Sequence, residues 1–122
     1  MIQTADPEWL EKAGRVARRY KATTRGARGA GHSVYVILLH DRRRLGRWGL
    51  YVGQTSRDPD WRFDQHKSGY KASGAVRRFG VRLLPDLVAH LNPMRAWEAL
   101  ELERALAEGF LAADVPWVEG GH

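Results

Sequence analysis

Two short runs of β-branched and aromatic residues limit what this chain can fold into. Val34–Leu39 is the longest continuous apolar run, and Leu50–Val52 follows after a segment rich in arginine and glycine. Residues of these types favour strands, and the longer run is far short of the roughly 20 residues that a membrane-spanning helix needs. We therefore predict an antiparallel hairpin with a long basic tip over 41–49, in a protein without membrane spans.

Capping residues and glycine stops predict the remaining elements. Asp6-Pro7 and Asp58-Pro59 each combine an N-cap residue with a first-turn proline, and Gly69 and Gly80 end helical segments. The segment 93–113 is rich in Ala, Leu and Glu and has no internal proline, which predicts a long final helix. The other expected elements are helices at about 7–21, 59–68 and 72–79 and a strand at 81–84, with 87–92 left ambiguous.

This order of strands and helices indicates a single small α+β domain. The 122 residues are too few for two substantial cores, while a hydrophobic fraction of 43% is enough to bury one. Residues 23–32 hold three glycines and no large apolar residue. We therefore separate an N-terminal helix and Gly/Arg-rich linker over 1–32 from a domain over 33–122. The absence of cysteine excludes disulfides and thiolate metal sites and suits a cytoplasmic location.

Positive charge is concentrated in two segments. The net charge is +6, and Lys and Arg outnumber Asp and Glu by 11 to 4 in residues 1–48 and by 7 to 3 in residues 57–82. Such clusters neutralise a phosphate backbone, although they can also simply keep a small domain in solution. Nucleic acid is thus the first partner to consider. The basic residues that we assign to it are Arg42, Arg43, Arg44, Arg47, Lys67, Lys71, Arg77 and Arg78.

One acidic residue falls on the apolar side of the predicted final helix. At about 100° per residue, Glu103 lies in the middle of the apolar arc, Glu98 lies near its boundary, and Glu101 and Glu108 lie opposite. A carboxylate that faces the packed side needs a partner, either an arginine or a hard divalent cation. The apolar arc consists of Ala96, Ala99, Leu100, Leu102, Leu106, Ala107 and Phe110.

Two residues of the predicted 59–68 helix suit phosphodiester chemistry. Arg62 and His66 are four positions apart and share a helix face. An arginine can grip a phosphate with two hydrogen bonds, and a histidine can exchange a proton near neutral pH. Such pairs also occur on solvated helices. Tyr35 and Tyr51 on the predicted hairpin are likewise either ordinary sheet aromatics or catalytic residues.

The ordered combination of these motifs resembles the GIY-YIG nuclease superfamily over residues 33–122. The resemblance implies a small three-stranded antiparallel sheet flanked by helices, here with an extra N-terminal helix. It also implies a divalent-metal-dependent hydrolase that cleaves phosphodiester bonds. The motifs that carry it are Val34-Tyr35-Val36, Leu50-Tyr51-Val52-Gly53, Arg62 with His66, and Glu103 within Glu-Ala-Leu-Glu-Leu-Glu.

The resemblance implies a role for each residue of the site. Tyr35 and Tyr51 would help to deprotonate the attacking water, with Tyr35 as the base and His66 as its proton acceptor or support. Arg62 would hold the scissile phosphate and stabilise its added negative charge. Glu103 would bind one Mg²⁺ or Mn²⁺ ion together with waters and substrate phosphate.

Other positions near these motifs leave alternatives open. Gly53 either lets the backbone approach another group closely or ends a strand. Gln54 stands where several relatives have lysine and could donate a hydrogen bond to a phosphate. The tyrosines are 16 positions apart, and the arginine-rich residues between them form either a basic finger over DNA or a solvated hairpin end.

We therefore predict a metal-dependent endonuclease or nicking enzyme that acts on nucleic acid, with DNA favoured. The alternative is a nucleic-acid-binding module with little catalytic activity. A third class, a protein-interaction module that uses Trp9, Trp48 and Trp61, has less support. A homodimer or a separate specificity partner would supply substrate preference, because the chain has no obvious recognition domain.

Overall fold

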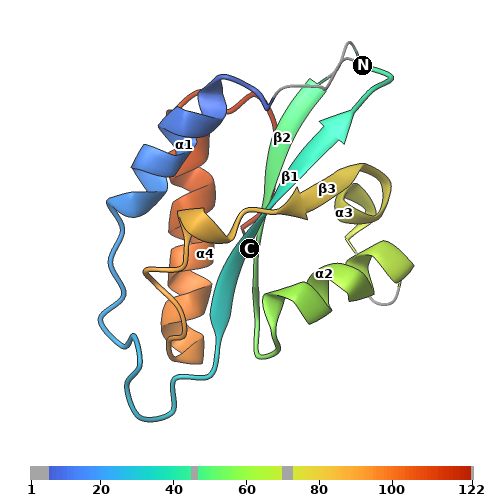
Figure 1. The fold of residues 1–122 in the computed structure, drawn as a ribbon. Coiled ribbons are helices and arrows are strands. Elements are labelled where there is room, and N and C mark those ends of the chain that lie inside the picture. Colours follow the sequence, from blue (N-terminus) through green and yellow to red (C-terminus); the bar gives the residue numbers. More distant parts are fainter. Residues whose placement is uncertain (1–5, 45–46, 70–72, 122) are drawn as a thin grey trace.

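A four-stranded mixed sheet with helices on both faces forms the structure (Figure 1), which is a computed structural model that describes residues 6–44, 47–69 and 73–121. The predicted α+β class is confirmed. No helix of these described residues has both the length and the apolar character to cross a membrane. The elements are α1 (Trp9–Arg18), β1 (Ser33–Asp41), β2 (Arg47–Thr55), α2 (Pro59–Ser68), α3 (Gly74–Phe79), β3 (Gly80–Leu83), the 3₁₀ helix η1 (Pro85–Leu87), α4 (Ala96–Ala112) and β4 (Val118–Gly120).

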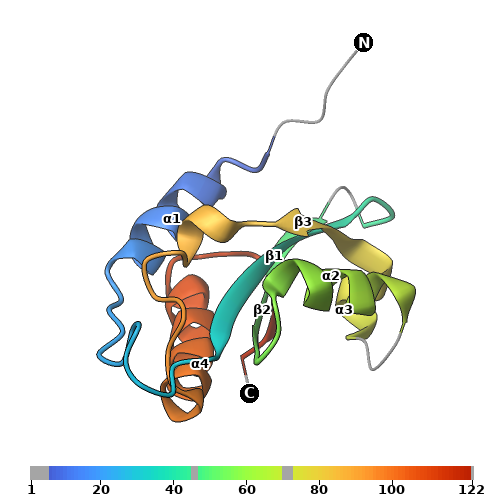
Figure 2. The ribbon, with the colours of Figure 1, turned by 60° about the horizontal axis from the view of Figure 1, so that its bottom comes forward.

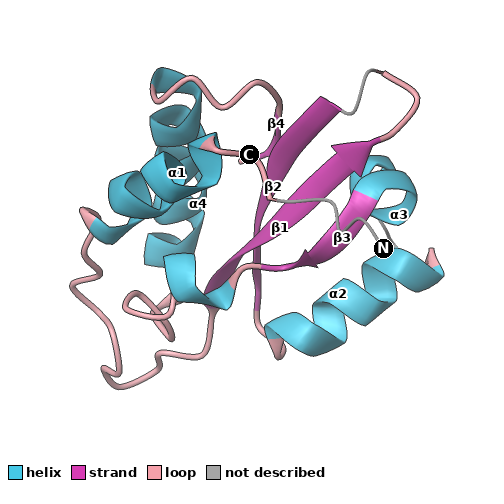
Figure 3. Ribbon diagram, turned by 45° about the horizontal axis from the view of Figure 1, so that its top comes forward, coloured by secondary structure: helices cyan, strands magenta, loops and turns pink. Residues whose placement is uncertain are grey.

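The predicted sheet of three antiparallel strands is corrected by a fourth strand. The strand order is β3-β1-β2-β4, with β1 between β2 and β3 (Figure 3). Because β4 runs parallel to β2, the sheet is mixed. Pairing begins where the Leu50 N–H donates to the Trp117 carbonyl at 2.9 Å, and it ends at Gly120. A strand of three residues is too short for its alternation to be recognised in a sequence.

The hairpin tip is shorter than the predicted segment 41–49. β1 continues to Asp41, which pairs with Arg47 at the start of β2, and residues 45–46 lie outside the described residues. The rings of His40 and Trp48 stack across the two strands with a centroid separation of 3.7 Å. Cross-strand pairing therefore extends both strands into residues whose polar character suggested a loop.

The two faces of the sheet support different helices (Figure 2). Along β1, even-numbered residues from Val34 to Leu38 pack with α1 and α4, and odd-numbered residues from Tyr35 to Leu39 pack on the side of α2 and α3. Ala13 of α1 lies in the same core as α4, so the N-terminal helix is packed on the sheet domain. Burying each large apolar side chain contributes about 1.5–3 kcal/mol.

Local signals locate α2 and α3 well. The predicted helix 59–68 is confirmed: the Asp58 carboxylate accepts the Asp60 N–H at 2.8 Å, and Gly69 ends α2 with a φ of 90°. α3 begins after Ser73, and Gly80 follows it as expected. α1 is shorter than the predicted 7–21, because Asp6 does not cap it. The Asp6 carboxylate instead pairs with Arg82 at 2.6 Å.

The long helix α4 begins at Ala96 instead of 93, after a cis peptide bond between Asn92 and Pro93. Glu103 is buried, as its position on the apolar arc predicted. The arc itself was centred wrongly, since Leu100 is 53% exposed and Glu98 is only 5% exposed. The helix is rotated toward Glu98, because this carboxylate has partners from a distant part of the chain.

Those partners anchor the linker to α4. Glu98 accepts four hydrogen bonds of 2.6–2.8 Å, from the N–H and hydroxyl groups of Thr23 and Thr24. Burial alone raises the pKa of the Glu98 carboxyl, but the hydrogen bonds outweigh it and lower this pKa to about 2. The linker therefore has a fixed attachment beside the first turn of α4.

We expect Glu98→Gln to lower the free energy of unfolding by about 3 kcal/mol at pH 7, because an amide cannot accept all four hydrogen bonds. The ionised carboxylate stabilises the fold fully above pH 4.5, and this contribution is lost as the pH falls toward 2. Urea unfolding at pH 7, 4 and 3 measures it, with Glu101→Gln on the exposed face of α4 as the control. A difference between the variants that does not change with pH would contradict this assignment.

Candidate active site

Three aromatic side chains meet on the α2 side of the sheet. The rings of Tyr35 from β1 and Tyr51 from β2 stack with centroids 6.1 Å apart, and the ring of His66 from α2 lies edge-on to Tyr51 at 5.4 Å. The Tyr35 hydroxyl is 2.9 Å from His66 Nε2. Tyr35 and His66 are buried, while Tyr51 is half-buried. The sequence-predicted residues Tyr35, Tyr51 and His66 therefore form one cluster.

Gly53 leaves the space that the ring of Tyr35 occupies. The two residues are opposite each other in the antiparallel register of β1 and β2. A Cβ atom at Gly53 would overlap the Tyr35 ring and hydroxyl, so no larger residue fits without movement. Of the two interpretations of Gly53, close approach is confirmed and strand termination is wrong, because β2 continues to Thr55.

The hydrogen bonds of His66 determine which of its nitrogens carries the proton. The Ser73 backbone N–H donates to His66 Nδ1 at 2.9 Å, so Nδ1 is an acceptor. A neutral imidazole then carries its proton on Nε2, which donates to the Tyr35 hydroxyl. Burial, with a contribution from the Arg62 guanidinium, lowers the His66 pKa to about 4 and keeps the ring neutral at pH 7. Of the two expected roles of His66, this arrangement favours support over proton acceptance.

The two tyrosines differ in their hydrogen bonds and exposure. Burial is the main cause that raises the pKa of both hydroxyls. The hydrogen bond between them raises the pKa of Tyr35 and lowers that of Tyr51, as expected when Tyr35 donates and Tyr51 accepts. The Ser73 N–H donates to His66 and the His66 Nε2–H donates to Tyr35, which leaves the Tyr35 proton available to Tyr51. These opposite effects on the two pKa values favour Tyr51 as the tyrosine that ionises, whereas the resemblance implies Tyr35.

Arg62 and Glu103 act on both tyrosines through their charges. Arg62 lowers the pKa of each tyrosine, whereas Glu103 raises it. Glu103 belongs to α4, on the opposite side of the sheet from α2. Gly120 lies against the Tyr51 ring and Val52, and the following glycine packs beside α4. All five predicted catalytic residues therefore belong to one electrostatic unit.

Glu103 is the candidate metal ligand of this unit. The described residues contain no group of three or more His, Asp or Glu side chains arranged to hold a metal ion. The buried carboxylate of Glu103 is an oxygen donor of the kind that Mg²⁺ and Mn²⁺ prefer, and Mg²⁺ often uses one or two carboxylates with waters and phosphate oxygens. The residues present thus fit an ion that binds mainly together with substrate.

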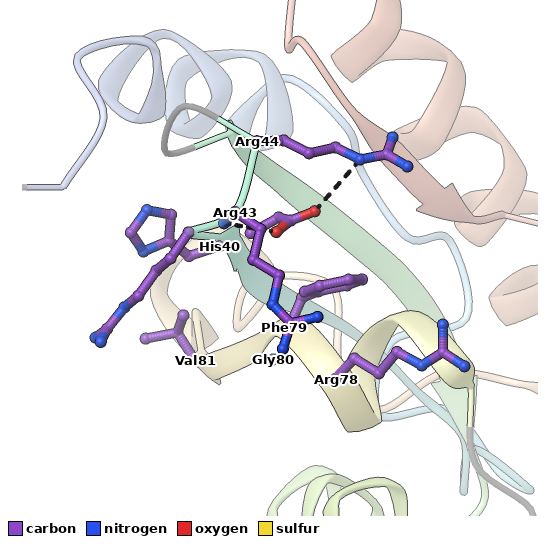
Figure 4. A pocket seen from close by; sticks show the side chains of 9 residues that line it. His40, Arg43, Arg44, Arg78, Phe79, Gly80 and Val81 are labelled. Carbon is purple, nitrogen blue, oxygen red and sulfur yellow. Dashed lines mark hydrogen bonds and ion pairs between the residues drawn. The ribbon is translucent and has the colours of Figure 1, made fainter.

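Four of the predicted nucleic-acid-binding residues line one cleft. Arg42, Arg43 and Arg44 at the hairpin end and Arg78 from α3 surround a hollow of about 820 Å³ (Figure 4). His40, Asp41, Phe79, Gly80 and Val81 complete its lining. The cleft lies at the hairpin end of the sheet, where Leu39 of β1 pairs with Gly80 of β3.

The other predicted nucleic-acid contacts have different surroundings. The Arg47 guanidinium lies over the Trp117 ring at 4.7 Å, and Lys67 Nζ donates to the carbonyls of Arg77 and Gly80. The Arg77 guanidinium lies beside Gly69, and Lys71 lies outside the described residues.

The pleat of β2 places Gln54 on the sheet face opposite the tyrosine cluster, and its phosphate contact stays a prediction. Tyr51 and Gly53 face the α2 side, so Gln54 faces α4 with Leu50 and Val52. Its side-chain oxygen is buried and has no hydrogen-bond partner in the described part of the chain.

Ser73 is the residue of the site that the sequence reasoning missed. Its side chain accepts the Val76 N–H as the N-cap of α3, and its own N–H orients His66. The serine before a helical segment is a recognisable cap signal, but a backbone donor to a histidine seven positions earlier leaves no signal in the sequence.

Comparison with known proteins identifies no relative: no protein-family model, curated protein or solved structure matches this chain. The relation to GIY-YIG nucleases therefore stays a prediction from the motifs.

We expect the protein to lose about 2 kcal/mol of stability through His66 as the pH falls from 6.5 to 5. The unfolded chain binds a proton near pH 6.5, but the folded protein resists protonation of His66 down to about pH 4. Urea unfolding of wild type and His66→Gln over pH 7 to 5 measures the difference in slope. Equal pH dependence in both proteins would show that His66 is not held neutral.

Proposed function

We propose that this protein is a metal-dependent endonuclease or nicking enzyme that hydrolyses phosphodiester bonds in nucleic acid, with DNA as the favoured substrate. The observation that carries the proposal is the cluster of Tyr35, His66 and the half-buried Tyr51, in which Ser73 and His66 fix the proton position beside Tyr35. Arg62 and Glu103, of opposite charge, both act on this hydroxyl. A base beside a cation and a carboxylate is the combination that phosphodiester hydrolysis needs.

In this proposal, Tyr51 first loses its hydroxyl proton to solvent, and the resulting phenolate takes the proton of the attacking water. Its pKa is raised by burial and by Glu103, and is lowered by the Tyr35 hydrogen bond and by Arg62. Tyr35 acts as a positioning residue. Its hydroxyl oxygen accepts the hydrogen bond from His66 Nε2–H, so its own proton is directed toward Tyr51. His66 and Ser73 fix this direction and take no proton themselves.

Arg62 and Glu103 would act on the substrate. The Arg62 guanidinium would bind the scissile phosphate and stabilise the negative charge that it gains during attack. Glu103 would hold one Mg²⁺ or Mn²⁺ ion. When bound, this ion would supply positive charge that stabilises the leaving oxygen and offsets the effect of the carboxylate on the tyrosines. A cytoplasmic location and a dimer or separate specificity partner complete the proposal.

The alternative is a nucleic-acid-binding module with little catalysis. It is favoured by the arginine-lined cleft, which needs no tyrosine chemistry, and by the burial that raises the pKa of both tyrosines. The buried carboxylate of Glu103 favours the enzyme instead, because it would repel phosphate in a module that only binds nucleic acid. A protein-interaction module has less support, since Trp9 and Trp48 pack against the core and only Trp61 of these three is largely exposed, at 44%.

We expect the purified protein to nick supercoiled plasmid or cleave branched DNA with Mn²⁺ or Mg²⁺ but not with chelator. Glu103→Gln should lose this cleavage by at least about 100-fold, because the metal loses its only proposed protein ligand. Glu101→Gln, on the exposed face of the same helix, is the matched control and should cleave normally. Absence of cleavage with every metal and substrate, while binding is intact in all variants, would favour the binding module.

We expect Tyr51→Phe to lower the cleavage rate by about 10²–10⁴-fold, the usual contribution of a general base. Tyr35→Phe removes the donor that lowers the Tyr51 pKa, so the rise of the rate with pH should move to higher pH. Rate profiles over pH 6 to 10 measure both effects. If Tyr35→Phe is inactive while Tyr51→Phe is active, Tyr35 is the base, as the family resemblance implies.

A further inference from the structure

The arginine-lined cleft is built from two elements that are distant in the sequence. Pairing of Leu39 in β1 with Gly80 in β3 places the hairpin end beside the last turn of α3. Arg43 points from the hairpin toward this turn, and Arg78 extends from the helix itself (Figure 4). The convergence of separate elements distinguishes this cleft from a run of arginines on a solvated loop.

One buried carboxylate, that of Asp41, contacts two of the arginine residues that line the cleft. Asp41 is 7% exposed, accepts the Arg43 N–H at 3.0 Å and pairs with the Arg44 guanidinium at 3.7 Å. The four arginines and this one aspartate leave the cleft a charge of +3. His40 adds none at pH 7, because burial and Arg42 lower its pKa. Asp41 therefore holds the loop in place while the cleft stays strongly positive.

The shape of the cleft suits a chain of phosphates. Its volume of about 820 Å³ is far larger than one phosphate group requires, and it is open to solvent along the hairpin and β3. Val81 on its wall is 47% exposed and can lie against sugar atoms. Arginine-lined surfaces of this kind bind the sugar-phosphate backbone without reading sequence.

The position of the cleft relates it to the candidate active site. Tyr35 and Asp41 lie on the same face of β1, because they are separated by an even number of residues. Six residues of a strand span about 20 Å at about 3.3 Å per residue. This length corresponds to about six base pairs of a duplex at about 3.4 Å per base pair.

We propose that the cleft binds the backbone of duplex DNA about six base pairs from the phosphate that reacts beside the tyrosine cluster. The inference deepens the proposed function, and only the distance rests on that function. A duplex that reaches both places binds more tightly than a shorter one, because the second contact forms within the same complex. The cleft adds affinity and orientation, and takes no part in the chemical step.

The test compares two double variants of equal charge. Arg43→Ala with Arg78→Ala alters the cleft. Arg19→Ala with Arg104→Ala removes two exposed arginines, one at the C-cap of α1 and one in α4, on the other side of the sheet. Binding of fluorescent DNA hairpins in chelator is followed by anisotropy between 50 and 200 mM salt. The cleft variant should lower the slope of log affinity against log salt by about 2, and the control should leave it unchanged.

The length of the hairpin stem tests the position of the cleft without any cleavage. Wild-type binding should tighten at least about tenfold as the stem grows from 4 to 12 base pairs, and the cleft variant should lose most of this gain. Equal salt slopes or equal length dependence in the two double variants would overturn the inference. A cleft-specific loss in a protein that cleaves nothing would refute the nuclease and keep the cleft. Normal cleavage without such a loss would keep the nuclease and refute the role of the cleft.

Discussion

The neutral imidazole of His66 is the group on which the arrangement of the candidate site depends. It is almost fully buried, and each of its nitrogens has one partner: the Ser73 N–H on one side and the Tyr35 hydroxyl on the other. The ring thereby links α2 to the start of α3 and to β1. A proton added to Nδ1 would face an N–H donor, so the same contacts that join the elements also exclude the charged form. The contacts that hold the His66 ring in place therefore also determine which of its nitrogens carries the proton.

The sheet separates the demands of stability from those of the site. One face carries the apolar core with α1 and α4, and the other face carries the aromatic and polar cluster under α2. Glu103 is the exception, since it comes from the apolar side and still acts on Tyr51. The close packing of Gly120 against Tyr51 shows how little material separates α4 from the cluster at this edge. Because Gly120 and Gly121 have no side chains, the chain fits between the Tyr51 ring and α4 at this edge.

The sequence was informative wherever the determining contact was local. The cap at Asp58 and the left-handed Gly69 located α2 at both ends, and helical spacing identified Glu103 as buried. It was misleading where partners came from far away: the donors to Glu98 lie more than 70 residues earlier, and these rotate α4 away from the predicted arc. The proton direction through His66 also escaped prediction, because a backbone N–H sets it.

The order of the strands has a consequence for the behaviour of the chain in concentrated solution. The segment Val34–Leu39 combines high β-propensity with the absence of charge, which is the signature of a sequence prone to aggregate. It lies in β1, an inner strand with neighbours on both sides. The outer strands have only four and three residues, and they end near Pro85 and at a left-handed Gly120. A second molecule can therefore pair only with short edge strands. The aggregation-prone segment Val34–Leu39 becomes accessible only when the sheet opens.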